Sequence, residues 1–350
     1  MTELIKVLWP SLLTAFFVSA VVSRLLAYLY VKKGWCAPSR TGGAMPLTGG
    51  IGIFIGFVVA SVTGFFCVLR ETSFVLEYSV ETFVIFTASL PFFILGLLDD
   101  IFHFKPLPKL TGFVLIAAVQ AALLSFYFLP LCWPDEPEVL AFVAFVPTAL
   151  FFFSNSYNFL DNANGHCASV FLGLSLVLLM IYRIDGAGAS LGLVLGAAVL
   201  GFLIWNFPFK PKLYLGDAGS LFLGACAFVL AFYCASEFNE YDIPIKFFVF
   251  LTILAFPLYD TCAVMLLRVL RGQNPTIGGQ DHYSHRLMRG GFPLWLVNLI
   301  AFTAAGILPV VFLKLPEGAV YFGPIAIWAF LLFIDVLAAF LCREKSDKNT

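Results

Sequence analysis

The chain has 350 residues, of which 61% are hydrophobic and only 12% charged, and its mean hydropathy is +0.96. These proportions exclude an ordinary soluble protein and a disordered one, and they indicate an integral membrane protein. The 20 Lys and Arg residues nearly balance the 21 Asp and Glu residues, so a basic nucleic-acid-binding protein is also excluded. The eight cysteines show no CxxC spacing and no cluster with histidine, so we expect small apolar core residues rather than a zinc site.

The apolar runs predict an all-α, polytopic membrane protein with about 11 transmembrane helices, because one span needs roughly 20 apolar residues. The expected spans cover approximately residues 7–30, 49–69, 79–98, 110–131, 138–155, 167–182, 189–206, 219–235, 244–267, 292–313 and 320–342. Lys32 and Lys33 follow the first run, which lacks a small-residue cleavage site, so we expect a retained span rather than a signal peptide. No internal repeat or linker is visible, and residues 1–350 are expected to form a single domain.

The distribution of Lys and Arg predicts the orientation. Most of these residues fall after the first, third, seventh and ninth expected spans and in the C-terminal tail. Short loops rich in Lys and Arg stay in the cytoplasm, so we expect the N-terminus outside and the C-terminus in the cytoplasm. The expected location is the inner, cytoplasmic membrane.

Several carboxylates fall at the inner ends of expected spans. Asp99 and Asp100 end the third span, Asp161 follows the fifth, Asp217 precedes the eighth, and Asp260 lies in the inner half of the ninth. A carboxylate at membrane depth is costly and is usually paired or functional. Together with Lys, Arg and His residues of the same loops, these acids are the residue types that bind Mg²⁺ and neutralise phosphate.

Each acid also has an ordinary interpretation. The Asp pair is equally typical of a solvated helix end, Asp161 of a turn former and Asp217 of a cap on the following span. Asp335, within the run FLLFIDVLAAF, has no neighbour in sequence that completes a site. We interpret Asp335 as an interhelical polar contact.

Five pieces of sequence carry a resemblance. They are GLLDD (96–100), NFLDNANG (158–165), YLGDAGS (214–220), FPLYDT (256–261) and DHYSHRL (281–287). In this order they resemble the polyprenyl-phosphate N-acetylhexosamine-1-phosphate transferase superfamily, glycosyltransferase family 4, and among its types most resemble undecaprenyl-phosphate N-acetylglucosamine-1-phosphate transferase. The resemblance covers about residues 34–290 and includes PLTGG (46–50).

The resemblance implies an Mg²⁺-dependent enzyme, with Mn²⁺ as an alternative metal. Such an enzyme transfers a sugar-1-phosphate, here N-acetylglucosamine-1-phosphate, from a UDP-sugar to undecaprenyl phosphate and releases UMP. This reaction is the first membrane step of a cell-envelope glycan pathway. The expected partners are the UDP-sugar and the lipid, with no nucleic acid. The sequence leaves open whether the protein forms a homodimer.

The resemblance also implies roles position by position. It implies catalytic roles for Asp99, Asp100 and Asp161. It implies metal ligation by Asp217 and Asn158. It implies phosphate binding by Lys109, His282, His285 and Arg286. It implies nucleotide contacts by Tyr214, Asn206 and Asn164.

Two departures from the family pattern bear on the donor. Asn164 stands where bacterial branches often have a second Asp. DHYSHRL replaces the three-histidine cluster of the muramoyl enzymes and also differs from the HxHH form common among the N-acetylglucosamine enzymes. The second departure argues against the alternative of a phospho-N-acetylmuramoyl-pentapeptide transferase. A secondary transporter and a non-catalytic scaffold are the alternatives from other classes. The mechanism is open between direct attack by the lipid phosphate and a two-step route through a phospho-aspartate at Asp161 or Asp99.

Overall fold

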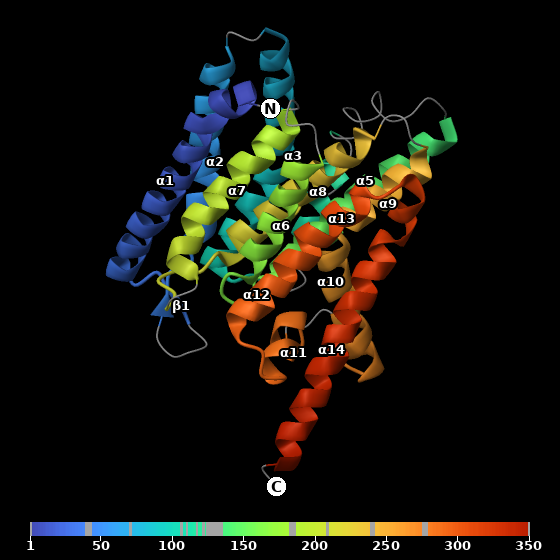
Figure 1. Ribbon diagram of the computed structural model, residues 1–350. Helices are drawn as coiled ribbons and strands as arrows, with labels where there is room; N and C mark the ends of the chain where they lie inside the picture. The colour runs from blue at the N-terminus through green and yellow to red at the C-terminus, as the bar shows by residue number, and fades with distance from the viewer. Residues whose placement is uncertain are drawn as a thin grey trace.

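The computed structural model is predominantly helical, and its helices form one bundle (Figure 1). It describes residues 2–38, 44–69, 72–105, 108–109, 111–116, 118–120, 123, 136–181, 187–207, 210–238, 242–274 and 279–348. The long helices are α1 (Thr2–Lys33), α2 (Gly49–Val68), α3 (Thr72–Phe102), α5 (Glu136–Leu160), α6 (His166–Met180), α7 (Ala187–Asn206), α8 (Gly216–Ser236), α9 (Ile243–Ile253), α10 (Ala255–Leu270) and α14 (Gly323–Lys348). The shorter elements are α11 (Tyr283–Arg289), α12 (Leu294–Phe302), the π-helix Thr303–Ile307, α13 (Leu308–Lys314), the 3₁₀ helix Glu317–Phe322, and the paired strands β1 (Ala37–Pro38) and β2 (Ala44–Met45).

The protein is a membrane protein with several spans. Seven helices are long and apolar enough to cross a bilayer, or eight if the bent pair α9 and α10 counts as one span, within the residues that the structure describes. The expected count of eleven is therefore not reached there. α6 is shorter than a full span, and most of the expected span 110–131 lies outside the described residues.

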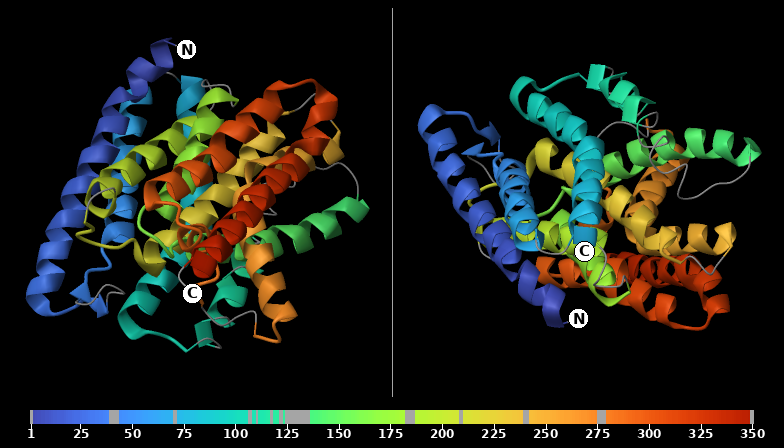
Figure 2. Two further views of the ribbon diagram at one scale, coloured as in Figure 1. Left: turned by 60° about the horizontal axis from the view of Figure 1, so that its bottom comes forward. Right: turned by 90° about the horizontal axis from the view of Figure 1, so that it is seen from above.

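Helix α8 forms the core of the bundle. It is apolar on all sides, and 94% of its most apolar stretch is buried, as expected for a helix surrounded by other helices. α3 and α5 pack against it, and α2 and α7 also contact it. Gly96 permits the close approach of α3, because a Cβ there would lie only 2.4 Å from the carbonyl oxygen of Asp217. Seen from above, α1 and α2 lie at one edge of the bundle and α12 to α14 along another (Figure 2, right).

A backbone pairing fixes the segment before α8. The Gly49 and Gly50 N–H groups donate to the carbonyl oxygens of Tyr214 and Leu215, at 3.0 and 2.8 Å, and the Tyr214 N–H donates to Pro46. PLTGG and YLGDAGS therefore lie side by side at the start of α8. This pairing explains what the PLTGG segment contributes to the site.

Helices α9 and α10 meet at a bend of 72°. Pro257 in the first turn of α10 has no N–H, so it cannot bond to the carbonyl of Ile253 one turn earlier, and the helix breaks. The piece FPLYDT begins immediately after this break. α10 runs toward the same end of the bundle as α11 and the strands (Figure 1).

Candidate active site

Four separate segments deliver polar side chains to one point at the start of α8. The Lys109 ammonium donates to Asp99 Oδ2 at 2.6 Å and to Asp217 Oδ2, so it bridges the end of α3 and the first turn of α8. Asn158, near the end of α5, donates from Nδ2 to Asp217 Oδ1 at 2.9 Å and to the Ser220 hydroxyl at 3.0 Å. We call Asp99, Lys109, Asn158 and Asp217 the acidic cluster.

Asp100 has a different position from its neighbour Asp99. Its two carboxylate oxygens accept the backbone N–H groups of Asp217 and Ala218, at 2.9 and 3.0 Å. The cap of α8 therefore comes from Asp100 on α3, and the interpretation of Asp217 as the cap is wrong because Asp217 lies inside the first turn. Gly216 adopts φ +79°, and a Cβ there would lie 2.6 Å from Asp100 Oδ2. Asp100 thus fixes the position of Asp217.

Two carboxylates face a single ammonium in the acidic cluster. Burial alone would lower the pKa of Lys109, but Asp217 and Asp99 outweigh it and hold that pKa above its ordinary value. The side chains of Lys109, Asp99 and Asp217 are 21%, 12% and 29% exposed, so a ligand can reach them. With one positive and two negative charges, the cluster carries a net charge of −1 and attracts a cation.

The acidic cluster offers oxygen ligands for a divalent metal. Within the described ranges, no three His, Cys, Asp or Glu side chains converge closely enough to hold a metal ion by themselves. Oδ2 of Asp99 and Oδ2 of Asp217 both accept from the Lys109 ammonium. The Asn158 amide donates to the other oxygen of Asp217. Two carboxylates and an amide are the hard oxygen ligands that suit Mg²⁺, which commonly takes its remaining ligands from phosphate and water. The residues therefore fit the metal.

Hydrogen bonds from two other segments hold the loop that follows α5. Asn206 accepts the Gly165 N–H at 2.6 Å and donates to the Leu213 carbonyl at 3.0 Å, and it is only 4% exposed. The expected nucleotide contact of Asn206 stays a prediction, but its amide is used here to join two loops. Asn164 is half-buried, and its backbone carbonyl accepts a hydrogen bond from Asn298.

Two further expected residues lie close to these loops in the chain. Asp161 is half-buried, and its N–H donates to the Asn158 carbonyl at 3.2 Å, so it closes the turn after α5 as its ordinary interpretation expects. Tyr214 is half-buried, and its backbone is held by Pro46 and Gly49. The roles implied for both side chains stay predictions.

The last loop is anchored to α10 by a buried carboxylate. Asp260 is fully buried and accepts His282 Nδ1 at 3.0 Å and the Tyr283 N–H at 2.6 Å. His282 is 4% exposed, and the Phe159 ring lies 5.4 Å from its ring. The Ser284 hydroxyl donates to Asn162, which joins this loop to the loop after α5. Asp260 and His282 both stand out in the sequence, but their pairing does not, because 22 residues separate them.

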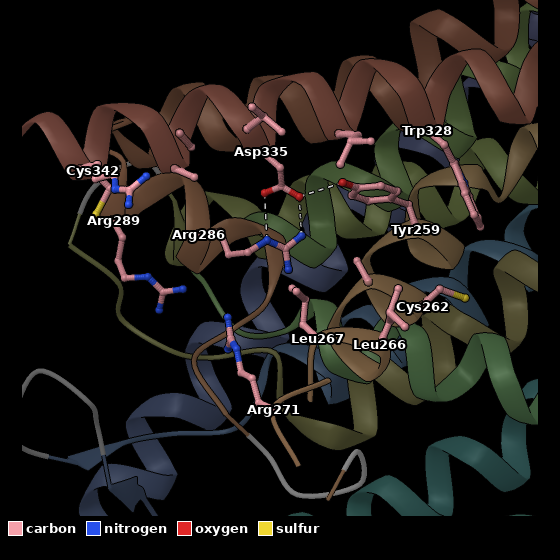
Figure 3. Close-up of a pocket in the computed structure, with 16 residues that line it drawn as sticks. Tyr259, Cys262, Leu266, Leu267, Arg271, Arg286, Arg289, Trp328, Asp335 and Cys342 are labelled. Atoms are coloured by element: carbon pink, nitrogen blue, oxygen red, sulfur yellow. Dashed lines mark hydrogen bonds and ion pairs between the residues drawn. The ribbon is translucent and has the colours of Figure 1, made fainter. Parts of the chain in front are cut away.

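Arg286 is engaged by Asp335 on α14. It donates to both oxygens of Asp335, at 2.9 and 2.7 Å, and to the Asp281 carbonyl, while Tyr259 donates to the same carboxylate (Figure 3). The interhelical contact predicted for Asp335 is thus confirmed. The phosphate-binding role implied for Arg286 stays a prediction. His285, on the same short helix, is half-buried.

Comparison with known proteins identifies the family. Residues 82–235 match the family described as glycosyl transferase family 4. A Sulfolobus acidocaldarius protein, provisionally named a UDP-N-acetylglucosamine–dolichyl-phosphate N-acetylglucosaminephosphotransferase, is 30% identical over 231 residues, which cover 61% of this chain and 67% of its own. The chain belongs to glycosyl transferase family 4. The matched residues of this family 4 protein contain the whole acidic cluster but not the loop of His282.

Two bacterial relatives of this family 4 protein match over most of its length. A Bacillus subtilis protein, named a probable undecaprenyl-phosphate N-acetylglucosaminyl 1-phosphate transferase, is 27% identical over 342 residues, covering 94% of this chain and 89% of its own. The Escherichia coli undecaprenyl-phosphate alpha-N-acetylglucosaminyl 1-phosphate transferase is 25% identical over 320 residues, covering 88% and 81%. The similarity therefore extends well beyond the residues that the family description covers.

Proposed function

We propose that this protein transfers N-acetylglucosamine-1-phosphate from its UDP-sugar to undecaprenyl phosphate, giving the undecaprenyl-diphospho-sugar and UMP. The observation that carries the proposal is the acidic cluster, in which side chains from four segments meet at one end of a membrane bundle. Phosphoryl transfer needs positioning and charge neutralisation more than covalent chemistry from the protein. The names of the bacterial relatives support the donor and the acceptor.

We assign the metal of this reaction to the acidic cluster. Asp217 and Asp99 would hold Mg²⁺, with the amide oxygen of Asn158 as a further ligand after rotation of that side chain. When bound, the metal neutralises charge on the diphosphate of the donor. Lys109, which now spans the two carboxylates, would then be free to contact a phosphoryl oxygen.

The chain needs no strong general base for the attack. The second pKa of a phosphate monoester is near 6, so the lipid phosphate is mostly a dianion at neutral pH and is already nucleophilic. With Asp99 engaged on the metal, Lys109 would orient the acceptor phosphate. Asp100 acts as a positioning residue, because both of its oxygens hold the backbone at Asp217.

Direct attack on the β-phosphorus is the route we favour over a phospho-aspartate. One oxygen of Asp99 accepts the Phe104 N–H at 2.9 Å and the other accepts Lys109, so an attack by either oxygen would disturb one of these bonds. Direct displacement inverts the configuration at the transferred phosphorus. A chiral phosphorothioate donor tests the route, and retention of configuration would contradict it.

The site's orientation completes the proposal. The acidic cluster lies near the ends of α3 and α5 and at the start of α8. We assign it to the cytoplasmic side of the inner membrane, because the loops after α3 and before α8 are rich in Lys and Arg. UDP-sugars would reach it there. The polar groups gather on this side rather than at the bilayer midplane, so a transporter is not favoured. The names of the relatives likewise do not favour a muramoyl-pentapeptide donor.

A panel of donors tests the proposal. Purified full-length protein is mixed with undecaprenyl phosphate, Mg²⁺ and one UDP-sugar at a time, and UMP release is measured. We expect UMP with UDP-N-acetylglucosamine, and none without the lipid. If folded protein releases UMP with none of the UDP-sugars, the enzyme assignment is overturned. If it releases UMP only with another UDP-sugar, the assignment of N-acetylglucosamine as the donor sugar is overturned.

A further inference from the structure

A cavity lies apart from the acidic cluster. It has a volume of about 750 Å³ and is enclosed by α10, α11 and α14 (Figure 3). Its walls are mostly apolar and include Leu266, Leu332 and Val336. The volume lies within the range of roughly 300–1,000 Å³ that is typical of ligand sites. No residue of the acidic cluster lines it. Because its apolar wall is exposed at the surface of the bundle, we call it the outer groove.

The outer groove is strongly basic at one end. Four arginines line it, Arg271, Arg286, Arg289 and Arg343, against the single carboxylate of Asp335. Asp335 is already neutralised by Arg286.

The other three arginines of the outer groove keep most of their donors. Arg289 gives one N–H to the Gln280 carbonyl at 2.7 Å. The side chains of Arg271 and Arg343 form no hydrogen bond or ion pair with any residue that the structure describes. Figure 3 shows Arg271 and Arg289 reaching from different segments toward the space beside Arg286. Three guanidinium charges are therefore left for a ligand.

The position of these charges matches the depth of lipid headgroups. Arg271 directly follows α10, and Arg343 ends the apolar span that begins at Gly318. The apolar wall residues Leu266, Leu332 and Val336 are 59%, 56% and 61% exposed. Only 17% of the most apolar stretch of the α14 span is buried, so this surface faces lipid. The charges thus lie at the membrane interface and the apolar wall lies deeper.

We propose that the outer groove binds an anionic glycerophospholipid of the surrounding membrane. Its phosphate would be held by Arg271, Arg289 and Arg343, and one acyl chain would lie along Leu332 and Val336. The guanidinium group suits phosphate because its N–H donors match the phosphate oxygens in pairs. Basic pockets between transmembrane helices are known to bind such headgroups. The bound lipid would brace α14 against α10 and α11, beside the Arg286–Asp335 pair.

The proposal is tested by lipid binding and does not rest on the proposed enzyme activity. Full-length protein in neutral detergent is titrated with dioleoyl phosphatidylglycerol, dioleoyl phosphatidylcholine or inorganic phosphate, and bound ligand is counted by native mass spectrometry. One basic residue at a membrane surface changes anionic-lipid affinity about fivefold. The double variant Arg271→Gln/Arg343→Gln should therefore bind phosphatidylglycerol about 30-fold more weakly.

Two further variants separate the effect of these arginines from the effects of other charges and of the groove's shape. Lys32→Gln/Lys33→Gln removes two exposed charges at the end of another span, α1, and should bind like the wild type. Ala339→Trp keeps every arginine but fills the outer groove, so it should weaken lipid binding and confirm that an acyl chain is seated there. The thermal midpoint in phosphatidylcholine verifies that each variant is folded.

Four outcomes would overturn the proposal. The first is equal phosphatidylglycerol binding by the arginine and lysine double variants, and the second is equal binding of phosphatidylcholine and phosphatidylglycerol by the wild type. The third is displacement of the lipid by inorganic phosphate at similar concentrations. The fourth is a raised KM of the arginine double variant for undecaprenyl phosphate, with its phosphatidylglycerol binding unchanged. The last result would assign the outer groove to the acceptor instead.

Discussion

Removing one partner of the Arg286–Asp335 ion pair should destabilise the protein more than replacing both partners does. The pair is bidentate, and its side chains are only 13% and 14% exposed. Arg286→Met would leave Asp335 with only the Tyr259 hydroxyl, and Asp335→Leu would leave Arg286 with only a backbone carbonyl. We expect the free energy of unfolding to fall by about 2 kcal/mol in each single variant and by about 1 kcal/mol in the double variant. A single variant loses more because it leaves one buried charge without its partner. The double-mutant cycle should then give a coupling energy of about 3 kcal/mol.

The cycle is measured by unfolding in mixed micelles with an increasing fraction of sodium dodecyl sulfate, and each variant is also assayed for UMP release. If Arg286 only positions α11, the double variant should keep kcat within a few-fold of the wild type. A group that neutralises charge at the reacting phosphates would instead cost roughly 10²–10³ in kcat. A stable double variant with a hundredfold lower kcat would refute our placement of Arg286 and restore the role that the family resemblance implies.

Two other substitutions test the site and its surroundings. Asp100→Asn should cost about 1–2 kcal/mol of stability, because it removes one acceptor from the cap of α8, and should lower kcat less than Asp217→Asn does; an equal loss would give Asp100 a direct catalytic role. The hydrogen bond from Arg268 holds the pKa of Asp281 below its ordinary value of 3.8, so this pairing stabilises the protein above that value and is lost as the pH falls through the lowered pKa. Asp281→Asn should therefore be less stable than the wild type at pH 6, and the gap in thermal midpoint should narrow below about pH 4; a gap independent of pH would contradict this.

The sequence alone predicted much of the site because charge is scarce in this chain. Asp99 and Asp217 end or begin an expected span, whereas Asn158 and Lys109 are named through the family resemblance, and the structure brings all four together. The sequence could not separate Asp99 from Asp100. Adjacent residues on a helix point in different directions, so one faces Lys109 and the other caps α8.

Contacts between distant segments were beyond sequence reasoning. Asp335 was assigned to a helix contact, but its partner Arg286 was assigned to phosphate, because nothing in either segment indicates that α11 lies against α14. The bend at Pro257 was also not predicted, since the apolar run continues through it and hydropathy alone does not register a missing N–H.

The role of the acidic cluster is tested most directly by one carboxylate substitution in the UMP-release assay. Asp217→Asn is compared with Asp242→Asn, which changes an exposed Asp at the start of α9 whose side chain makes no capping hydrogen bond. Both purified proteins receive UDP-N-acetylglucosamine, undecaprenyl phosphate and Mg²⁺. We predict that Asp217→Asn lowers kcat at least about a hundredfold and that Asp242→Asn matches the wild type. Wild-type turnover by a folded Asp217→Asn protein would contradict the assignment of the active site.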